Sequence, residues 1–138
     1  MTFLSFDVLK LHVNAAYSNI KSQLETKENI LCLDGEPYTG LVKKEEEGER
    51  LEQNYSNGLL HGIQKVFYQN GKIKSATMYT NGMENGRRIE YYSCGAKKLN
   101  ANYCEGSIDG IYEEWDKFGI LILRKTFFNG KLIAIKSN

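Results

Sequence analysis

The sequence has little of what most catalytic sites need. It contains one proline, two histidines (His12 and His61) and three cysteines (Cys32, Cys94 and Cys104). The cysteines form no CxxC pair and are odd in number, which predicts free thiols in a reducing compartment. Histidine, cysteine and carboxylate residues do not come together at the spacing of a metal site. We therefore expect no enzyme activity, no metal and no cofactor.

A strong net charge and long apolar runs are also missing. The formal net charge is +1, so the whole chain carries no field that would gather nucleic acid or an anionic membrane. No run approaches the ~18 apolar residues of a membrane span, and the first residues lack the basic start of an export signal. These absences predict a soluble, cytoplasmic protein with no nucleic-acid partner. The charges are unevenly distributed, because residues 1–58 have six basic and ten acidic residues, whereas residues 59–138 have twelve and seven.

Glycine and tyrosine are abundant by comparison, with 13 and nine residues. Glycine supplies the positive φ angles of tight turns and tyrosine suits a half-buried strand, so together they favour many short strands. Twelve of the thirteen glycines recur in three series, with steps of 22 to 24 residues. The series are Gly40, Gly62, Gly86 and Gly110; Gly48, Gly71, Gly95 and Gly119; and Gly58, Gly82, Gly106 and Gly130. The chain therefore contains a repeat of about two dozen residues.

Aromatic residues follow the same period. Three residues before each glycine of the third series stand Tyr55, Tyr79, Tyr103 and Phe127, and four residues before Gly71, Gly95 and Gly119 stand Phe67, Tyr91 and Trp115. The first unit is imperfect, with Lys44 in place of the second aromatic, as is common for the end unit of a repeat array. The agreement between glycines and aromatics predicts four repeated units over residues 35–138.

Each unit has the pattern of a β-hairpin. In the second unit, residues 63–68 form one strand-like run, Asn70-Gly71 supplies a strong turn signal, and residues 73–79 form the return strand. The sequence therefore predicts a mainly β fold, a single-layer antiparallel meander of β-hairpin repeats. Period-2 alternation places both aromatic columns on one packing face and leaves residues such as Arg88 and Glu90 on the opposite, wet face.

Residues 1–34 lie outside the repeat and predict a cap. An apolar stripe with 3–4 spacing favours a helix over residues 6–25, although residues 3–13 also suit a strand. Residues 30–33 predict a leading strand into the sheet. The stripe comprises Phe6, Leu9, Val13, Ala16, Ile20 and Leu24.

Four segments resemble known repeats. Residues 79–86 and 57–62 resemble the MORN repeat, whose core is an aromatic, then Asn-Gly, then a glycine four residues later. Residues 68–74 and 35–40 resemble the variant repeat of the bacterial YwqK antitoxin family, and the resemblance extends over about residues 35–133. It implies a β-hairpin array that serves as an interaction surface, with no catalytic motif and an antitoxin role for many members.

A basic patch is the main candidate site. We expect neighbouring strands to bring together Arg87, Arg88, Lys97 and Lys98, with Tyr68, Tyr92 and Tyr112 close by. Arginine and tyrosine dominate binding hot spots, so this patch predicts a surface for an acidic protein, although ordinary solvated strand charge also explains it. The acidic run over residues 45–49 is interpreted as a solvated hairpin tip.

These features predict a protein-binding repeat module, with an antitoxin or immunity protein that neutralises a toxin by direct binding as the leading hypothesis. The alternative is a membrane-surface or scaffold protein of the MORN kind that binds anionic lipid or assembles a complex, although the low net charge makes a membrane partner less expected. An exposed terminal strand near residues 120–135 also predicts an edge-to-edge homodimer.

Overall fold

The computed structural model describes residues 24–137, which form strands and turns throughout. A small sheet contains β1 (Leu24–Lys27), β2 (Ile30–Leu33) and β3 (Glu36–Pro37). The large sheet contains β4 (Gly40–Glu46), β5 (Glu49–Ser56), β6 (Leu59–Leu60), β7 (Gly62–Phe67), β8 (Ile73–Thr80), β9 (Met83–Tyr91), β10 (Lys97–Cys104), β11 (Ser107–Ile108), β12 (Gly110–Trp115), β13 (Leu121–Phe128) and β14 (Lys131–Ser137).

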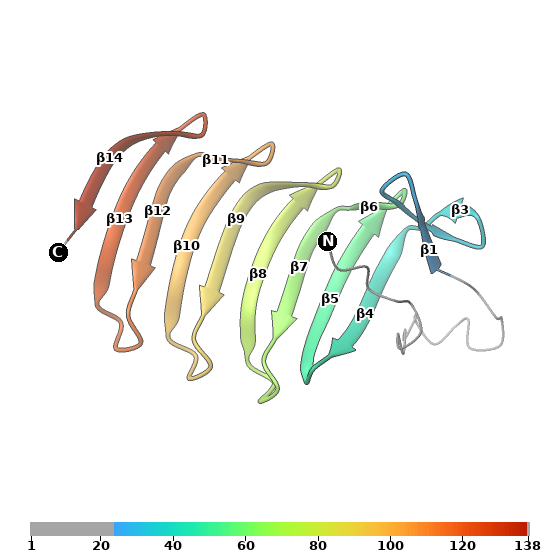
Figure 1. Cartoon of the computed structure of the whole chain (residues 1–138), viewed down its shortest axis with the longest axis horizontal. Coiled ribbons are helices and arrows are strands. Elements are labelled where there is room, and N and C mark those ends of the chain that lie inside the picture. The colour runs from blue at the N-terminus through green and yellow to red at the C-terminus, as the bar shows by residue number, and fades with distance from the viewer. Residues whose placement is uncertain (1–23, 138) are drawn as a thin grey trace.

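The large sheet is an antiparallel meander. Its strands follow one another in chain order from β4 to β14, and the short strands β6 and β11 pair with β5 and β10. The long strands lie side by side in one curved layer, with the small sheet at the β4 end (Figure 1). The predicted mainly β meander of hairpins is therefore confirmed.

The predicted helix over residues 6–25 falls mostly outside the described residues, but its end is wrong. Leu24 and Glu25 belong to strand β1, which pairs with β2 through a two-residue turn at Glu28 and Asn29. These two residues have φ angles of 50° and 67°, so they form the left-handed turn without the glycine that usually signals it. Residues 30–33 do form a strand, β2, but it belongs to the small sheet and not to the large one.

Two-residue turns with positive φ at both positions line one edge of the large sheet. They are Asn57-Gly58, Asn81-Gly82, Glu105-Gly106 and Asn129-Gly130. Their twist matches that of the flanking strands, which explains why the third glycine series keeps its period. Each turn also hydrogen-bonds to the preceding unit, because the amides of Gly82 and Gly106 donate to the carbonyls of Leu60 and Glu84 at 2.8 Å. The repeated glycines therefore both turn the chain and join successive units.

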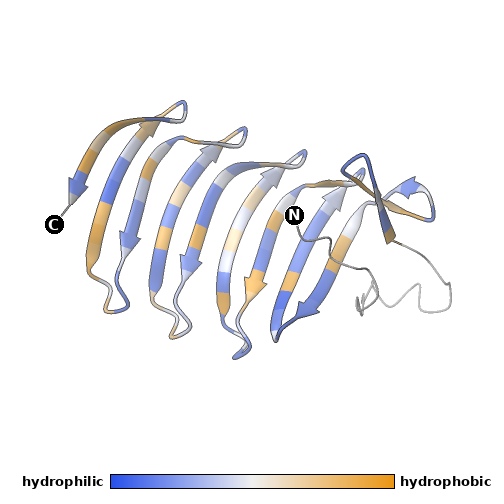
Figure 2. Ribbon diagram, viewed as in Figure 1, coloured by the Kyte–Doolittle hydropathy of each residue, from blue (hydrophilic) through white to orange (hydrophobic). Residues whose placement is uncertain are grey.

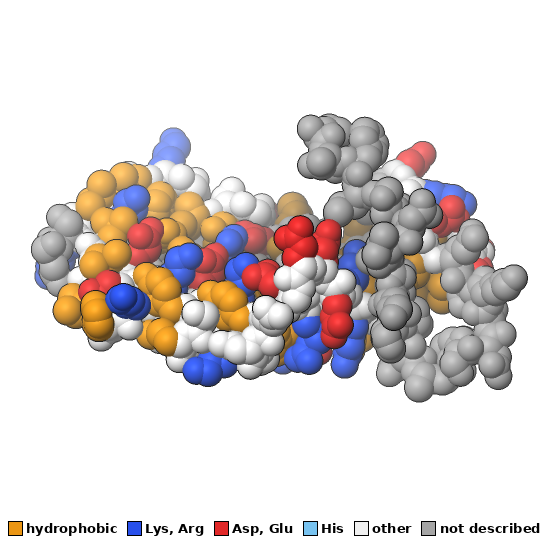
Figure 3. Space-filling model, turned by 60° about the horizontal axis from the view of Figure 1, so that its bottom comes forward, with side chains coloured by type: hydrophobic (Ala, Val, Ile, Leu, Met, Phe, Trp, Pro, Cys, Tyr) orange, Lys and Arg blue, Asp and Glu red, His pale blue; other side chains and the backbone are white. Residues whose placement is uncertain are grey.

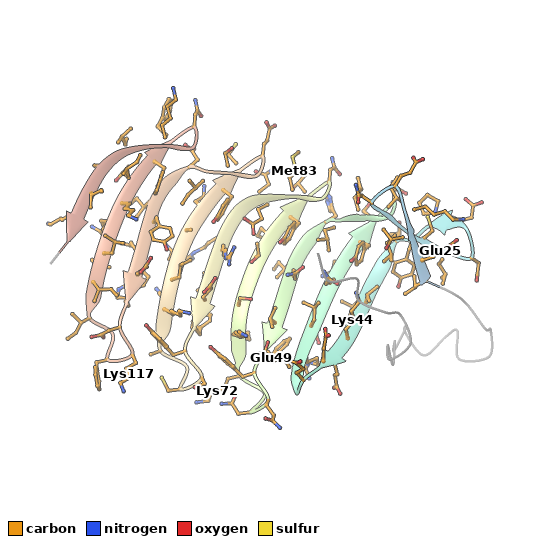
Figure 4. All side chains as sticks on the ribbon, in the orientation of Figure 1. Glu25, Lys44, Glu49, Lys72, Met83 and Lys117 are labelled. Carbon is orange, nitrogen blue, oxygen red and sulfur yellow. The ribbon has the colours of Figure 1, made fainter. Side chains whose placement is uncertain are left out.

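Longer turns line the opposite edge. In the turn after β7, the amide of Tyr68 donates to the carbonyl of Lys72, and the amide of Gly71 donates back to the carbonyl of Tyr68, both at 2.9 Å. Lys72 and Lys117 lie at this edge, whereas Met83 lies at the edge of the two-residue turns (Figure 4). Gly71, Gly95 and Gly119 of the second glycine series mark these longer turns, whereas Gly48 lies in the two-residue turn between β4 and β5.

The predicted single packing face is wrong, because a β-bulge separates the two aromatic columns. In the β7–β8 hairpin Val66 pairs with Ser75, but the next residue, Phe67, pairs with Ile73. The register shifts by one residue at this point, and the same shift recurs between β9 and β10 and between β12 and β13. A one-residue shift reverses which face a side chain occupies. Phe67, Tyr91 and Trp115 therefore lie on the face opposite to Tyr55, Tyr79, Tyr103 and Phe127.

We call the side that carries Tyr55, Tyr79, Tyr103 and Phe127 the tyrosine face, and the side that carries Phe67, Tyr91 and Trp115 the basic face. Val42, Thr77 and Ala101 are buried on the tyrosine face, and Phe67 is buried on the basic face. Apolar and polar residues alternate along the strands (Figure 2). Since few side chains are fully buried, the single layer keeps both faces accessible over much of its length.

Candidate protein-binding surface

The charges of the tyrosine face neutralise one another. Arg88 contacts Glu84 and Glu90, with its guanidinium nitrogens 3.3 Å and 2.6 Å from their carboxylate oxygens, and the Lys98 ammonium lies 3.9 Å from Glu90. Strand pairing and ion pairs place five basic and five acidic residues on this face. The basic residues are Lys44, Lys74, Arg88, Lys98 and Lys125, and the acidic residues are Glu46, Glu49, Glu84, Glu90 and Glu114. Five basic and five acidic residues leave this face without net charge.

Arg88 and Tyr112 are embedded in this network. Burial lowers the pKa of the Arg88 guanidinium, but hydrogen bonding to Glu90 and the charge of Glu84 outweigh it, so that the pKa is raised overall. Burial raises the pKa of the Tyr112 hydroxyl, and its hydrogen bond to the Glu114 carboxylate raises it further. The Tyr112 ring also meets Phe127 edge-on, with 6.4 Å between centroids. Both residues already have partners within the fold.

Tyr68 and Tyr92 join successive hairpins. The Tyr68 hydroxyl donates to the carbonyl of Tyr91 at 2.7 Å, and the Tyr92 hydroxyl donates to the carbonyl of Trp115 at 2.9 Å. Lysine ammonium groups lie over both rings, with Lys74 5.6 Å from the Tyr68 centroid. Tyr68 and Tyr92, which the sequence analysis named as site residues, therefore stabilise the contact between successive hairpins at the edge of the longer turns.

The basic face has a different balance. Its strand-paired basic residues are Lys43, Arg50, Lys65, Arg87, Lys97, Arg124, Lys131 and Lys136, and its strand-paired acidic residues are Glu45, Glu52 and Glu113. The Arg87 guanidinium donates to the neutral amide oxygen of Asn100 at 2.7 Å. Within residues 24–137, Lys65 and Lys97 have no carboxylate within ion-pair distance. Eight basic residues against three acidic ones give this face a clear positive charge.

Aromatic rings hold part of this charge in place. The Arg50 guanidinium lies 4.1 Å from the centroid of Phe67, and the Lys97 ammonium lies 5.0 Å from the centroid of Trp115. Such stacking fixes the cation without neutralising it. Arg50 and Lys97 are therefore held in defined positions near the edge of the longer turns.

Apolar side chains lie beside these charges. Ile63 and Met78 are paired across β7 and β8 on the basic face, and their exposed fractions are 41% and 37%. Ile111 on β12 shares this face and is 49% exposed. The basic face thus combines exposed aliphatic groups with positive charge.

The four basic residues of the predicted patch do not form one cluster. Arg88 and Lys98 lie on the tyrosine face, whereas Arg87 and Lys97 lie on the basic face. Neighbouring residues in a strand point to opposite sides, so each consecutive pair is divided by the sheet itself. Sequence reasoning missed Ile63 and Ile111 as surface residues, although with Arg87 they recur at the 24-residue step, which could have marked them.

The acidic run forms the predicted hairpin tip. Glu46 and Glu49 close the β4–β5 hairpin around the turn residues Glu47 and Gly48. The Lys74 ammonium lies 2.6 Å from Glu49 and balances part of this charge. A hollow beside the tip is lined by Lys44, Glu46, Glu47, Glu49, Arg50, Leu51, Val66 and Lys74. Within residues 24–137, no three His, Cys, Asp or Glu residues are grouped so that they could hold a metal ion.

Comparisons of the sequence with known proteins identify no family for the chain. No protein-family model matches the chain, and no curated protein is significantly similar to it. The resemblance to MORN and YwqK repeats therefore stays a prediction from the sequence. Among the described residues, no helix has the length and apolar character needed to cross a membrane.

Proposed function

We propose that the protein is a non-catalytic binding module that holds an acidic protein partner on its basic face. The observation that carries this proposal is the excess of eight basic over three acidic strand residues on that face. Exposed Ile63, Met78 and Ile111 add the apolar contact area that a stable complex needs. An acidic partner with its own apolar side chains complements both features.

A toxin is the partner class that the sequence resemblance favours. An antitoxin or immunity protein neutralises its target by covering it, which requires a broad and ordered surface. The hydrogen bonds that join successive hairpins, such as that of Tyr68, support such a surface along the sheet. A single-layer sheet also suits covering better than catalysis, because enzymes usually enclose their substrates in a concave pocket.

The test begins with the protein encoded beside this chain's gene. The two proteins are co-expressed, and the complex is isolated through an affinity tag on the neighbour. We expect a stable complex that weakens as the salt concentration rises, because salt screens the attraction between exposed charges. If the neighbour arrests growth, co-expression of this chain restores it.

Charge-reversal variants identify the face that binds. Arg87→Glu and Lys97→Glu are each expected to weaken the complex by about tenfold or more, because each places repulsion in the contact area. Lys117→Glu makes the same charge change at a turn after β12 and is expected to leave the affinity unchanged. A complex that tolerates the first two variants as well as the third contradicts binding by the basic face.

The combination of aliphatic and basic residues on one face also favours a second candidate, a membrane-surface or scaffold protein. Flotation with phosphatidylserine vesicles at low and high salt tests it. The attraction of lysine and arginine to anionic lipid decays over about one Debye length, and added salt shortens that length. Salt-sensitive flotation together with no binding to the neighbouring protein would replace the first proposal with this one.

A further inference from the structure

The strand β14 offers an unpaired edge. It pairs with β13 on one side, and no strand of the described residues lies on its other side. Strand β9, which begins 48 residues earlier at the equivalent position of the repeat, is covered on both sides by β8 and β10. The free amides and carbonyls of an edge strand can pair with another chain.

The sequence of β14 departs from the repeat at this edge. The inner units carry a polar residue and a glycine where β14 carries Ile133 and Ala134; these pairs are His61-Gly62, Asn85-Gly86 and Asp109-Gly110. The three glycines have φ angles between 86° and 107°, whereas Ala134 does not have a positive φ. The last unit has therefore lost both the glycine and the polar residue found at this position elsewhere.

The replacement exposes apolar groups. Leu132, Ile133 and Ile135 are 47%, 63% and 59% exposed. The strand is largely hydrophobic along its length (Figure 2), and hydrophobic side chains gather over this end of the molecule (Figure 3). Terminal units of repeat arrays ordinarily present a polar outer face to water. The exposed apolar residues of β14 depart from that pattern.

We propose that β14 pairs antiparallel with β14 of a second copy of this chain, across a two-fold axis perpendicular to the sheet. Strand direction favours this partner. The main path of the sheet has nine antiparallel strands, so β4 and β14 run parallel to each other. Head-to-tail stacking would therefore join the two edges in parallel, whereas β14 against β14 continues the antiparallel pattern and closes the assembly as a dimer.

The side chains fit a register centred on Ala134. In this register Ile133 stands opposite Ile135 of the second copy, so aliphatic residues of the two copies lie next to each other across the new strand pair. Lys131 stands opposite Ser137 of the second copy and Lys136 opposite Leu132 of the second copy, so no lysine opposes a lysine. The charges of the strand therefore permit the pairing that its isoleucines favour.

The dimer has a consequence for the binding face. A two-fold axis perpendicular to the sheet keeps the basic faces of both copies on the same side, which doubles the length of that surface. A partner with two equivalent sites would then bind the dimer more tightly than it binds a single copy. The proposed dimer contact involves only the edge of β14, so its test does not depend on the proposed function.

The test measures the mass of the full 138-residue chain by light scattering after size exclusion. We expect the wild type at twice the chain mass of 15.8 kDa. The double variant Ile133→Glu with Ile135→Glu is expected to halve the measured mass, because carboxylates would face one another across the axis. We expect the fold to accept a glutamate at position 135, which lies opposite Lys125 on β13. Ile111→Glu, at the equivalent repeat position inside the array, is the matched control and stays dimeric.

A charge-swap experiment separates lost pairing from lost folding. The double variant Ile133→Lys with Ile135→Lys is also expected to be monomeric, and mixing it with the double glutamate variant is expected to restore the dimer mass. A monomeric wild type at every concentration, a dimeric double glutamate variant, or a mixture that stays monomeric would each overturn the proposal. The variants Arg87→Glu and Lys97→Glu, which are expected to weaken binding of the acidic partner, are expected to keep the dimer mass.

Discussion

Replacement of Gly58 by alanine tests how the small sheet is attached to the large one. Gly58 is buried at a φ of 77°, its amide donates to the carbonyl of Tyr38 at 2.7 Å, and its carbonyl accepts from the amide of Leu31 at 2.9 Å. A β-carbon at this position would lie 2.2 Å from Cγ2 of Ile30 and 2.7 Å from the carbonyl oxygen of Leu31. The second of these atoms belongs to the backbone, so the strand itself must move.

The magnitude follows from two separate costs. Alanine in the left-handed region costs about 1–2 kcal/mol. Forcing an extra carbon into a packed site costs about 1–3 kcal/mol more. Gly106 provides the matched control, because its φ is 80° and a β-carbon there meets no atom within 4 Å. We therefore expect Gly58→Ala to lower the free energy of unfolding by about 1–3 kcal/mol more than Gly106→Ala.

Urea denaturation of the two variants and the wild type measures the difference. Amide hydrogen exchange at Leu31 and Tyr38 shows where it arises, since both amides take part in the hydrogen bonds around Gly58. Exchange at these amides is expected to rise in Gly58→Ala and to stay unchanged in Gly106→Ala. Equal destabilisation by the two variants would refute the steric argument and leave only the cost of the backbone conformation.

Two further predictions concern side chains. Phe67→Ala is expected to lower the free energy of unfolding by about 3–5 kcal/mol, because Phe67 is only 9% exposed. Phe118→Ala, at 79% exposure, is expected to leave it nearly unchanged, and equal losses in thermal or urea unfolding would contradict this. Burial raises the pKa of Tyr55 and Tyr79, and burial with Glu114 raises that of Tyr112, so these phenols should ionise above the ordinary value of about 10. A raised folded-state pKa means that the stabilisation is complete below pH ~10 and is lost as the pH rises through the folded values. Tyrosinate absorbance during alkaline titration measures this, and ionisation of every tyrosine in one step near the ordinary pKa would exclude it.

The repeat can be predicted from the sequence, because a tight turn needs particular residues. Positive φ at Gly82, Gly106 and Gly130 is inexpensive only for glycine, so the turn positions had to appear as a glycine series. The runs between them alternate in polarity and are too short for helices, which made the antiparallel meander predictable. The β1–β2 turn at Glu28 and Asn29 carries no glycine, and for that reason this hairpin was not foreseen.

The faces were decided by the tertiary structure alone. A bulge shifts the register beside Phe67, Tyr91 and Trp115, and neither the spacing nor the residue types show where the extra residue will fall. Because the side-chain period of a strand is two, this single shift moved one aromatic column to the opposite side. Arg88 meets Glu84 and Glu90 of its own strand, at an even spacing that the sequence shows. The ion pairs Lys74–Glu49 and Lys98–Glu90 join different strands, so only the tertiary structure decided them. The sequence by itself thus determined the strands and turns, and the hydrogen-bonded register between strands determined which side chains share each face.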